Sequence, residues 1–347
     1  MTGLPAAPDT AARVDELLGM AYRSRHDDTR KALGFARQAH ELSDRTGHAP
    51  GRAWALLRMA LCEHILADPK RQYEQRLGES IALMRDLGDQ AGEAEAMNLL
   101  GSILNTRGEH EAALDLYRRC RELRETLGDL SGVTAAMNNV GLTLRMLSRT
   151  GEALDWLGRS LEIALAQADT LRIAYAHLNL GEVFLDLDDA ATAIEHLEQA
   201  FSRVARTEDR ALECSILIGL ARSRALQGAN DAALGLLQHA QGLALRTGNV
   251  RDQARVAMAQ AAVEQGRGGH AAAEAHLHAT LASLRRAEER TLEADVLVRL
   301  AHSQWQLGRA DAALGWLERA LELASSTGQA LVADSARRLT SQIRLAG

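Results

Sequence analysis

Hydrophobic positions recur at helical spacing along the chain, and the whole pattern repeats every 40 residues. In one copy a polar turn at residues 107–109 separates two apolar stripes, made of Leu100, Gly101, Leu104, Ala113, Tyr117, Cys120 and Leu123. Apolar residues three or four positions apart are typical of amphipathic helices. Each copy is therefore predicted to form a helix, a turn and a second, antiparallel helix.

The repeat predicts the architecture of the whole chain. Six copies keep one register, starting at Met97, Met137, His177, Leu217, Ala257 and Leu297, and weaker copies precede them. A period of this length indicates stacked helical units. We expect one all-α domain over 1–347, a right-handed superhelical solenoid of about seven helix-turn-helix repeats closed by a polar capping helix at 331–345. The repeat boundaries are expected near 10–48, 49–90, 91–130, 131–170, 171–210, 211–250, 251–290 and 291–330.

Small residues mark the points where helices pack closely. The first helix of each well-aligned copy has a small residue at one position, occupied by Gly101, Gly141, Gly181, Ala221, Ala261 and Ala301. A glycine ends the first helix in four copies, as expected for a C-terminal helix cap: Gly108, Gly228, Gly268 and Gly308.

At these positions the chain resembles a tetratricopeptide-repeat array. Leu100, Gly101, Leu104, Gly108, Ala113, Tyr117 and Cys120 match the small and large positions of that family at its own spacing. The unit is longer than the common one of about 34 residues, so it is more similar to the long-repeat branch of kinesin light chains and the LGN/Pins polarity adaptors. The resemblance implies a concave groove, lined by the first helices, in which amides hold a peptide by its backbone.

Helical geometry indicates which side chains line that groove. Positions three before, one after and four after the key glycine share one face of the first helix. Read along the array, and with the neighbouring asparagines added, they give these partner-binding candidates: Asn98, Ser102, Asn105, Asn138, Asn139, Arg145, Asn179, Glu182, Arg222, His302 and Trp305.

Several candidates allow a second interpretation. Asn98 and Asn138 are expected in the groove, whereas Asn139 and Asn179, one position along, either join them or bond an adjacent helix. Arg145 and Arg222 are groove contacts or solvated surface charges. Trp305 is an exposed contact or a cover over the core of the last repeat.

Composition and charge narrow the function classes. Aromatic residues make up 3% of the chain, four residues are proline, and the net charge of −6 leaves no basic stripe, so nucleic acid is not expected as a partner. No uncharged apolar run reaches about 18 residues, so no membrane span is expected and the protein should be cytoplasmic. Three scattered cysteines form no C-x-x-C pair, which excludes a disulfide framework.

The sequence offers no convincing catalytic or metal site. His270, Glu274 and His278 share a helix face, but no H-E-x-x-H motif exists. GRGGH at 266–270 lies at a repeat turn and lacks the Lys and Ser/Thr of a phosphate-binding loop, and Asp188 or Asp189 is better interpreted as a helix cap than as a calcium ligand. We expect no enzyme activity, metal or cofactor.

These observations predict a non-catalytic scaffold or adaptor that binds a protein or peptide segment in its concave groove, within bacterial signalling or regulation. The bacterial assignment rests on the Ala-, Arg- and Leu-rich composition. The alternative is a ligand- or peptide-sensing regulatory module whose output domain lies on another chain or on a missing segment. Homo-oligomerisation stays open, because exposed ends of a stack can self-associate.

Overall fold

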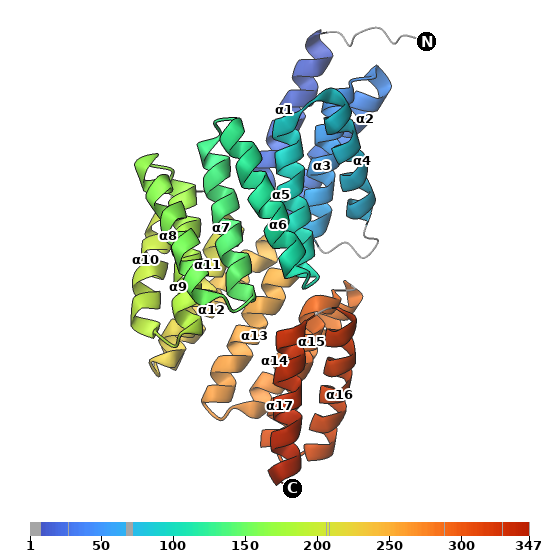
Figure 1. The fold of residues 1–347 in the computed structure, drawn as a ribbon. Helices are drawn as coiled ribbons and strands as arrows, with labels where there is room; N and C mark the ends of the chain where they lie inside the picture. Colours follow the sequence, from blue (N-terminus) through green and yellow to red (C-terminus); the bar gives the residue numbers. More distant parts are fainter. Residues whose placement is uncertain are drawn as a thin grey trace.

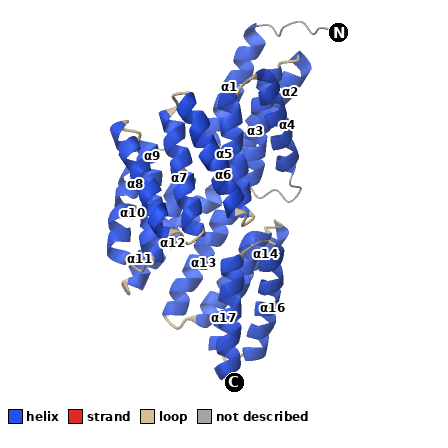
Figure 2. Ribbon diagram, in the orientation of Figure 1, coloured by secondary structure: helices blue, strands red, loops and turns tan. Residues whose placement is uncertain are grey.

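The computed structural model describes residues 8–26, 28–66, 72–205, 207, 209–287, 289–327 and 329–346, and all regular structure within these ranges is helical (Figure 2). The helices are α1 (Pro8–Ser24), α2 (Thr29–Thr46), α3 (Ala49–Ile65), α4 (Gln72–Leu87), α5 (Gln90–Thr106), α6 (His110–Thr126), α7 (Leu130–Met146), α8 (Thr150–Ala166), α9 (Thr170–Asp186), α10 (Ala190–Val204), α11 (Arg210–Leu226), α12 (Asn230–Thr247), α13 (Val250–Gly266), α14 (His270–Arg286), α15 (Arg290–Gln306), α16 (Ala310–Ser326) and α17 (Ala330–Ala346).

The helices follow one another as antiparallel pairs in an elongated, curved stack, with the chain ends far apart (Figure 1). This confirms the predicted all-α solenoid of about seven repeats and a cap. Counted helix by helix, the described ranges contain eight pairs and the single helix α17, because both degenerate N-terminal segments fold as pairs. No helix in these ranges combines the length and apolarity needed to cross a membrane.

The curvature follows from which helices touch. Most first helices pack on the first helix of the next pair, as α7 does on α9 and α9 on α11, while no two second helices make comparable contact in the described ranges. The first helices therefore lie on the shorter, inner arc of the stack.

Glycine is required where α7 crosses α8, the second helix of its pair. A Cβ on Gly141 of α7 would lie 2.5 Å from Leu157 Cγ of α8 and 3.3 Å from the Ala153 carbonyl oxygen. Leu157 and Ala153 are fully buried. The small residue predicted from the repeat thus permits close packing of the pair.

Aspartates at a 40-residue interval begin several of the inner helices. Asp89, Asp129, Asp169 and Asp209 each accept a hydrogen bond from the backbone N–H three residues later. Such caps satisfy donors that a helix start leaves free. Asp189 does the same for α10, which confirms the expected cap in that segment.

The stack also contacts itself across its turn. Arg251, in the first turn of α13, donates a hydrogen bond from its guanidinium to the backbone carbonyl of His64 near the end of α3. Arg30 of α2 lies against Gly248, just before α13. The second and seventh helix pairs are therefore neighbours, although four pairs separate them in the chain (Figure 1).

Candidate functional site

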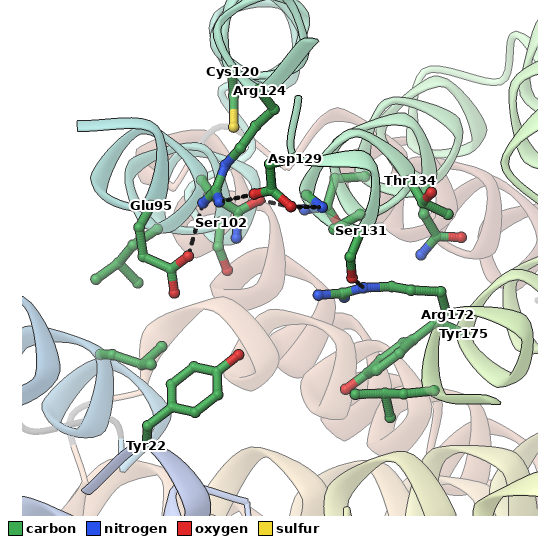
Figure 3. A pocket seen from close by; sticks show the side chains of 18 of the residues that line it. Tyr22, Glu95, Ser102, Cys120, Arg124, Asp129, Ser131, Thr134, Arg172 and Tyr175 are labelled. Carbon is green, nitrogen blue, oxygen red and sulfur yellow. Dashed lines mark hydrogen bonds and ion pairs between the residues drawn. The ribbon is translucent and has the colours of Figure 1, made fainter. Parts of the chain in front are cut away.

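A pocket opens among the first helices of the first five pairs. It has a volume of about 390 Å³, and we name it the N-terminal pocket. Its polar lining comes mainly from the inner helices α1, α3, α5, α7 and α9 and from the turn after α1, with a contribution from α6 and the turn that follows it (Figure 3). The polar lining side chains are Tyr22, Arg25, His26, Arg58, Glu95, Asn98, Ser102, Arg124, Asp129, Ser131, Thr134, Asn138, Asn139, Arg172 and Tyr175.

Three asparagines form the amide part of this lining. Asn139 Nδ2 donates to Asn98 Oδ1 at 2.7 Å, which ties α7 to α5. Asn138 is 7% exposed, and its Oδ1 accepts no hydrogen bond from any described residue. A buried acceptor without a donor destabilises a fold by about 1–3 kcal/mol. Asn138 therefore presents an acceptor that a bound N–H donor would satisfy.

On one side of the pocket, ion pairs hold the acidic groups. Glu95 accepts from Arg58 at 3.1 Å and from Arg124 at 2.9 Å, and Arg124 also bonds Asp129 (Figure 3). Burial raises the pKa of Glu95, but the two guanidinium groups outweigh burial and hold it below its ordinary value. Both carboxylates are therefore ionised and already engaged at neutral pH.

The opposite side is built around Tyr175 of α9. Its hydroxyl donates to Asp209 Oδ2 at 2.8 Å, and burial together with Asp209 raises the pKa of Tyr175 well above its ordinary value. Arg172 donates from Nε to Ser131 Oγ at 3.3 Å, and the Arg25 guanidinium stacks 3.7 Å from the Tyr22 ring centre. This side brings the first and fifth helix pairs to one cavity.

The structure gathers four of the predicted partner-binding residues in the N-terminal pocket: Asn98, Ser102, Asn138 and Asn139. Asn105 does not line it. Asn105 Nδ2 donates to Thr143 Oγ1 at 2.9 Å, and its Oδ1 lies 3.1 Å from His110 Nδ1, so this amide joins two repeats.

Three further candidates form a separate ion cluster along the inner helices. Glu182 is buried and pairs with Arg145 at 3.3 Å and with Arg222 at 2.7 Å, and Asp186 also contacts both arginines. Burial raises the pKa of Glu182, but Arg222 and Arg145 outweigh it and lower the pKa overall. The two arginines are thus partners of Glu182, an arrangement that the sequence did not indicate.

The remaining candidates lie apart from the pocket. Asn179 is buried within α9. His302 stands beside His270, with ring centres 5.9 Å apart, and Trp305 packs partly buried against the C-terminal core. That placement of Trp305 matches the interpretation as a cover over the last repeat.

Several of the lining residues that sequence analysis missed obey the same facial rule, although Arg124 of α6 and Asp129 in the following turn do not. Tyr22 and Arg25 stand one and four positions after Ala21, the counterpart of the key glycine, and Arg58 stands three before its counterpart in the second repeat. One turn further upstream on the same face lie Glu95 and Tyr175. Reading the face through the first two repeats, and one turn earlier in each, would have found them.

Among the described residues, no group of three or more His, Cys, Asp or Glu side chains is placed to hold a metal ion. Glu274 lies 3.6 Å from His278 Nε2, but it also accepts hydrogen bonds from Gln304 and Arg309. The Glu274 carboxylate therefore has partners in the next repeat.

Comparison with known proteins identifies the repeat. Models of the tetratricopeptide repeat match residues 92–166 and 294–327. No curated protein sequence matches the chain. The long 40-residue repeat type stays a prediction.

Solved structures show the same fold at low identity. A Rap protein complexed with Competence and Sporulation Factor is 12% identical, with a TM-score of 0.66, over 97% of this chain and 98% of that one. The Rap conjugation gene regulator of plasmid pLS20, in complex with the Phr* peptide, is 13% identical, with a TM-score of 0.64, over 90% and 95%. A Signal Transduction ATPase with Numerous Domains from Pyrococcus horikoshii, which has a tetratricopeptide repeat sensor, is 12% identical with a TM-score of 0.55, and 91% of this chain covers 49% of that protein.

Proposed function

We propose that this chain, a tetratricopeptide-repeat protein, is a non-catalytic interaction scaffold that binds an extended peptide segment in the N-terminal pocket. The observation that carries the proposal is the buried Asn138 Oδ1, which lines the pocket without a donor. A peptide backbone presents N–H donors and C=O acceptors in alternation, and carboxamides pair with both. The volume of about 390 Å³ lies in the range of sites that enclose small ligands.

The proposal is supported by the state of the acidic groups. Glu95 and Asp129 are held by arginines, so neither is free to act as a general base. The two Rap proteins of similar fold support a peptide as the ligand class, since one is in complex with the Phr* peptide and the other with Competence and Sporulation Factor.

The test is selection of binders from a displayed library of random heptapeptides, followed by fluorescence anisotropy with the selected peptides. Asn138→Ala should weaken binding about tenfold, because a hydrogen bond to a buried group is lost. Asn230→Ala, at the start of α12 and outside the pocket lining, is the matched control and should leave binding unchanged. A library without binders, or binders indifferent to Asn138→Ala, would overturn the proposal.

A regulatory sensor, in bacterial signalling or elsewhere, is the second candidate, and one observation favours it. The N-terminal pocket is lined by both the first and the fifth helix pairs, which are linked through the inner arc, so a ligand that touches both biases their spacing. Small-angle scattering with and without saturating peptide distinguishes the two functions. A changed radius of gyration supports the sensor, and an unchanged one supports the adaptor.

A further inference from the structure

We propose that the fifth helix pair contains an acid-sensitive joint, formed by His177 of α9 and His196 of α10. While both rings are neutral, one hydrogen bond between them holds the two helices together, and proton uptake by the rings loosens the pair. Neither ring lines the N-terminal pocket, and the inference does not depend on the proposed function.

The first argument is that histidine replaces apolar residues at both positions. On the first helix, the six well-aligned copies have Met97, Met137, His177, Leu217, Ala257 and Leu297. On the second helix, they have Leu116, Trp156, His196, Leu236, His276 and Trp316. Among these copies only the fifth pair has histidine at both positions. A polar contact therefore occurs there at positions that are apolar in most other pairs.

The second argument is the contact between the two rings. The Nδ1 atoms of His177 and His196 lie 3.0 Å apart, and His177 is 9% exposed. Phe184, also of α9, stacks on the His196 ring with the ring centres 5.4 Å apart. At this Nδ1 separation one ring donates a proton and the other accepts it, so the two rings have different tautomers. Two side chains of α9 thus hold the His196 ring.

The third argument is the effect of added protons on this contact. One added proton leaves the hydrogen bond in place, because the protonated ring still donates to the neutral ring. A second proton removes the remaining acceptor and places two positive charges side by side where burial already disfavours charge. The contact that joins α9 to α10 then becomes repulsive.

Burial sets the pH range of the joint. Burial, with smaller effects of His196 and Arg203, lowers the pKa of His177 from 6.5 to about 4. Burial also lowers the pKa of His196, and Glu195 opposes this shift in part. Both of these charged groups belong to α10, and among the described residues no ionisable side chain of the neighbouring helices α7, α8 and α11 perturbs either ring. Because the open state takes up protons first, the joint has its full stability above about pH 6.5 and weakens as the pH falls toward about 4.

A change at the joint reaches beyond the fifth pair, because α9 belongs to the inner arc of the stack. The same helix carries Arg172 and Tyr175, which line the N-terminal pocket. It also carries Glu182, which pairs with Arg145 and Arg222 in the two neighbouring pairs. Loosening of α9 from α10 therefore makes the packing of the inner helices respond to acidity.

The test is amide hydrogen exchange of α10 between about pH 6.5 and about pH 4.5. Each rate is divided by the rate of an unstructured chain at the same pH, which gives the equilibrium constant for opening of the helix. The comparison is a double variant with His177→Leu and His196→Leu, because the sixth pair has leucine at both positions. Over this range the opening constant of the wild type should rise about 10- to 100-fold more than that of the double variant.

The matched control is His276→Leu. His276 occupies the position of His196 in the seventh pair, but its counterpart on α13 is Ala257. This variant should keep the wild-type pH dependence of α10. Circular dichroism establishes that each variant is folded.

Nitrogen NMR of the imidazole rings in the wild type tests the hydrogen bond without any substitution. At neutral pH one of the two rings should carry its proton on Nδ1 and the other on Nε2.

Either measurement can overturn the inference. An equal rise of the α10 opening constant in the wild type and the double variant contradicts the acid-sensitive joint. Protons on Nε2 of both rings contradict it as well, because the contact then has no Nδ1 donor. Neither measurement uses a peptide, so a failure here leaves the proposed function untouched.

Discussion

Gly181 of α9 tests the packing principle of the whole stack. A Cβ at this position would lie 2.7 Å from Leu197 Cγ and 3.3 Å from the Ala193 carbonyl oxygen. Leu197 is fully buried and also lies against Gly219 of α11, so it has little room to move away. Gly181→Leu therefore inserts four carbons where the first already overlaps its neighbours.

The magnitude follows from two opposing effects. Overpacking of this kind destabilises the folded protein by roughly 1–3 kcal/mol and occasionally more. Replacing a glycine inside a helix by a better helix former stabilises the helix by up to about 1 kcal/mol. Because the Leu197 side chain overlaps the added Cβ and a backbone oxygen is in tight contact with it, we expect a net loss of more than about 2 kcal/mol in the free energy of unfolding. The substitution lies in the fifth of eight pairs, so it should also divide the stack into two separately unfolding parts.

Urea unfolding followed by circular dichroism measures both effects. Gly235→Leu is the matched control, because Gly235 is exposed on α12 with no atom within 4 Å of its added Cβ. The control should unfold at the same or slightly higher urea concentration than the wild type, in one transition. If Gly181→Leu and Gly235→Leu shift the transition alike, or if Gly181→Leu unfolds in one unshifted step, the packing argument is refuted.

Two further predictions concern titratable groups. Burial, reinforced by Arg251 and Arg107, lowers the pKa of His64 to about 3, so the unfolded chain takes up a proton first and the stability of the fold decreases as pH falls below about 6.5. The difference in unfolding free energy between the wild type and His64→Gln should therefore change with pH below about 6.5 by up to about 1.4 kcal/mol per pH unit. A difference that stays constant with pH would contradict this prediction. Glu182→Ala should lower the unfolding free energy at pH 7 by about 2 kcal/mol, which is less than for a fully buried ion pair because Arg222 is partly exposed. Since the pKa of Glu182 is lowered in the folded protein, this loss of stability should shrink as pH falls below about 4.5. Equal stability of the wild type and the variant at pH 7 would argue against a stabilising role of the ion cluster.

The fold was predictable because the repeat encodes it locally. Three signals recur every 40 residues: the helical spacing of apolar residues, the small residue at each helix crossing and the cap at each turn. The same prediction is therefore made independently in each repeat. The turn keeps its backbone conformation even where glycine is replaced: Gly108, Ser148 and Asp188 occupy equivalent positions, and all three have a positive φ. Local pattern was therefore enough to place the pairs.

The candidate site was predictable in part. The facial rule located Asn98 and Asn138, because both depend on helix geometry alone. It did not indicate that Arg25 and Arg172 share a cavity, since that depends on the small rotation between successive pairs, which spacing along a helix does not encode. Arg145 was hard to assign for another reason: its partner Glu182 lies in the next repeat, and pairing across repeats requires the three-dimensional stack.

The hydrogen bond from Arg251 to the His64 carbonyl joins residues 187 positions apart. Most contacts in a solenoid are local, which favours rapid folding from several starting points. Closing so long a loop carries an entropic cost that falls sharply once the intervening chain is ordered. This contact therefore forms late, after the third to sixth pairs have assembled, and it opens whenever any of them unfolds. Amide protection at the end of α3 accordingly reports on the integrity of the four pairs between.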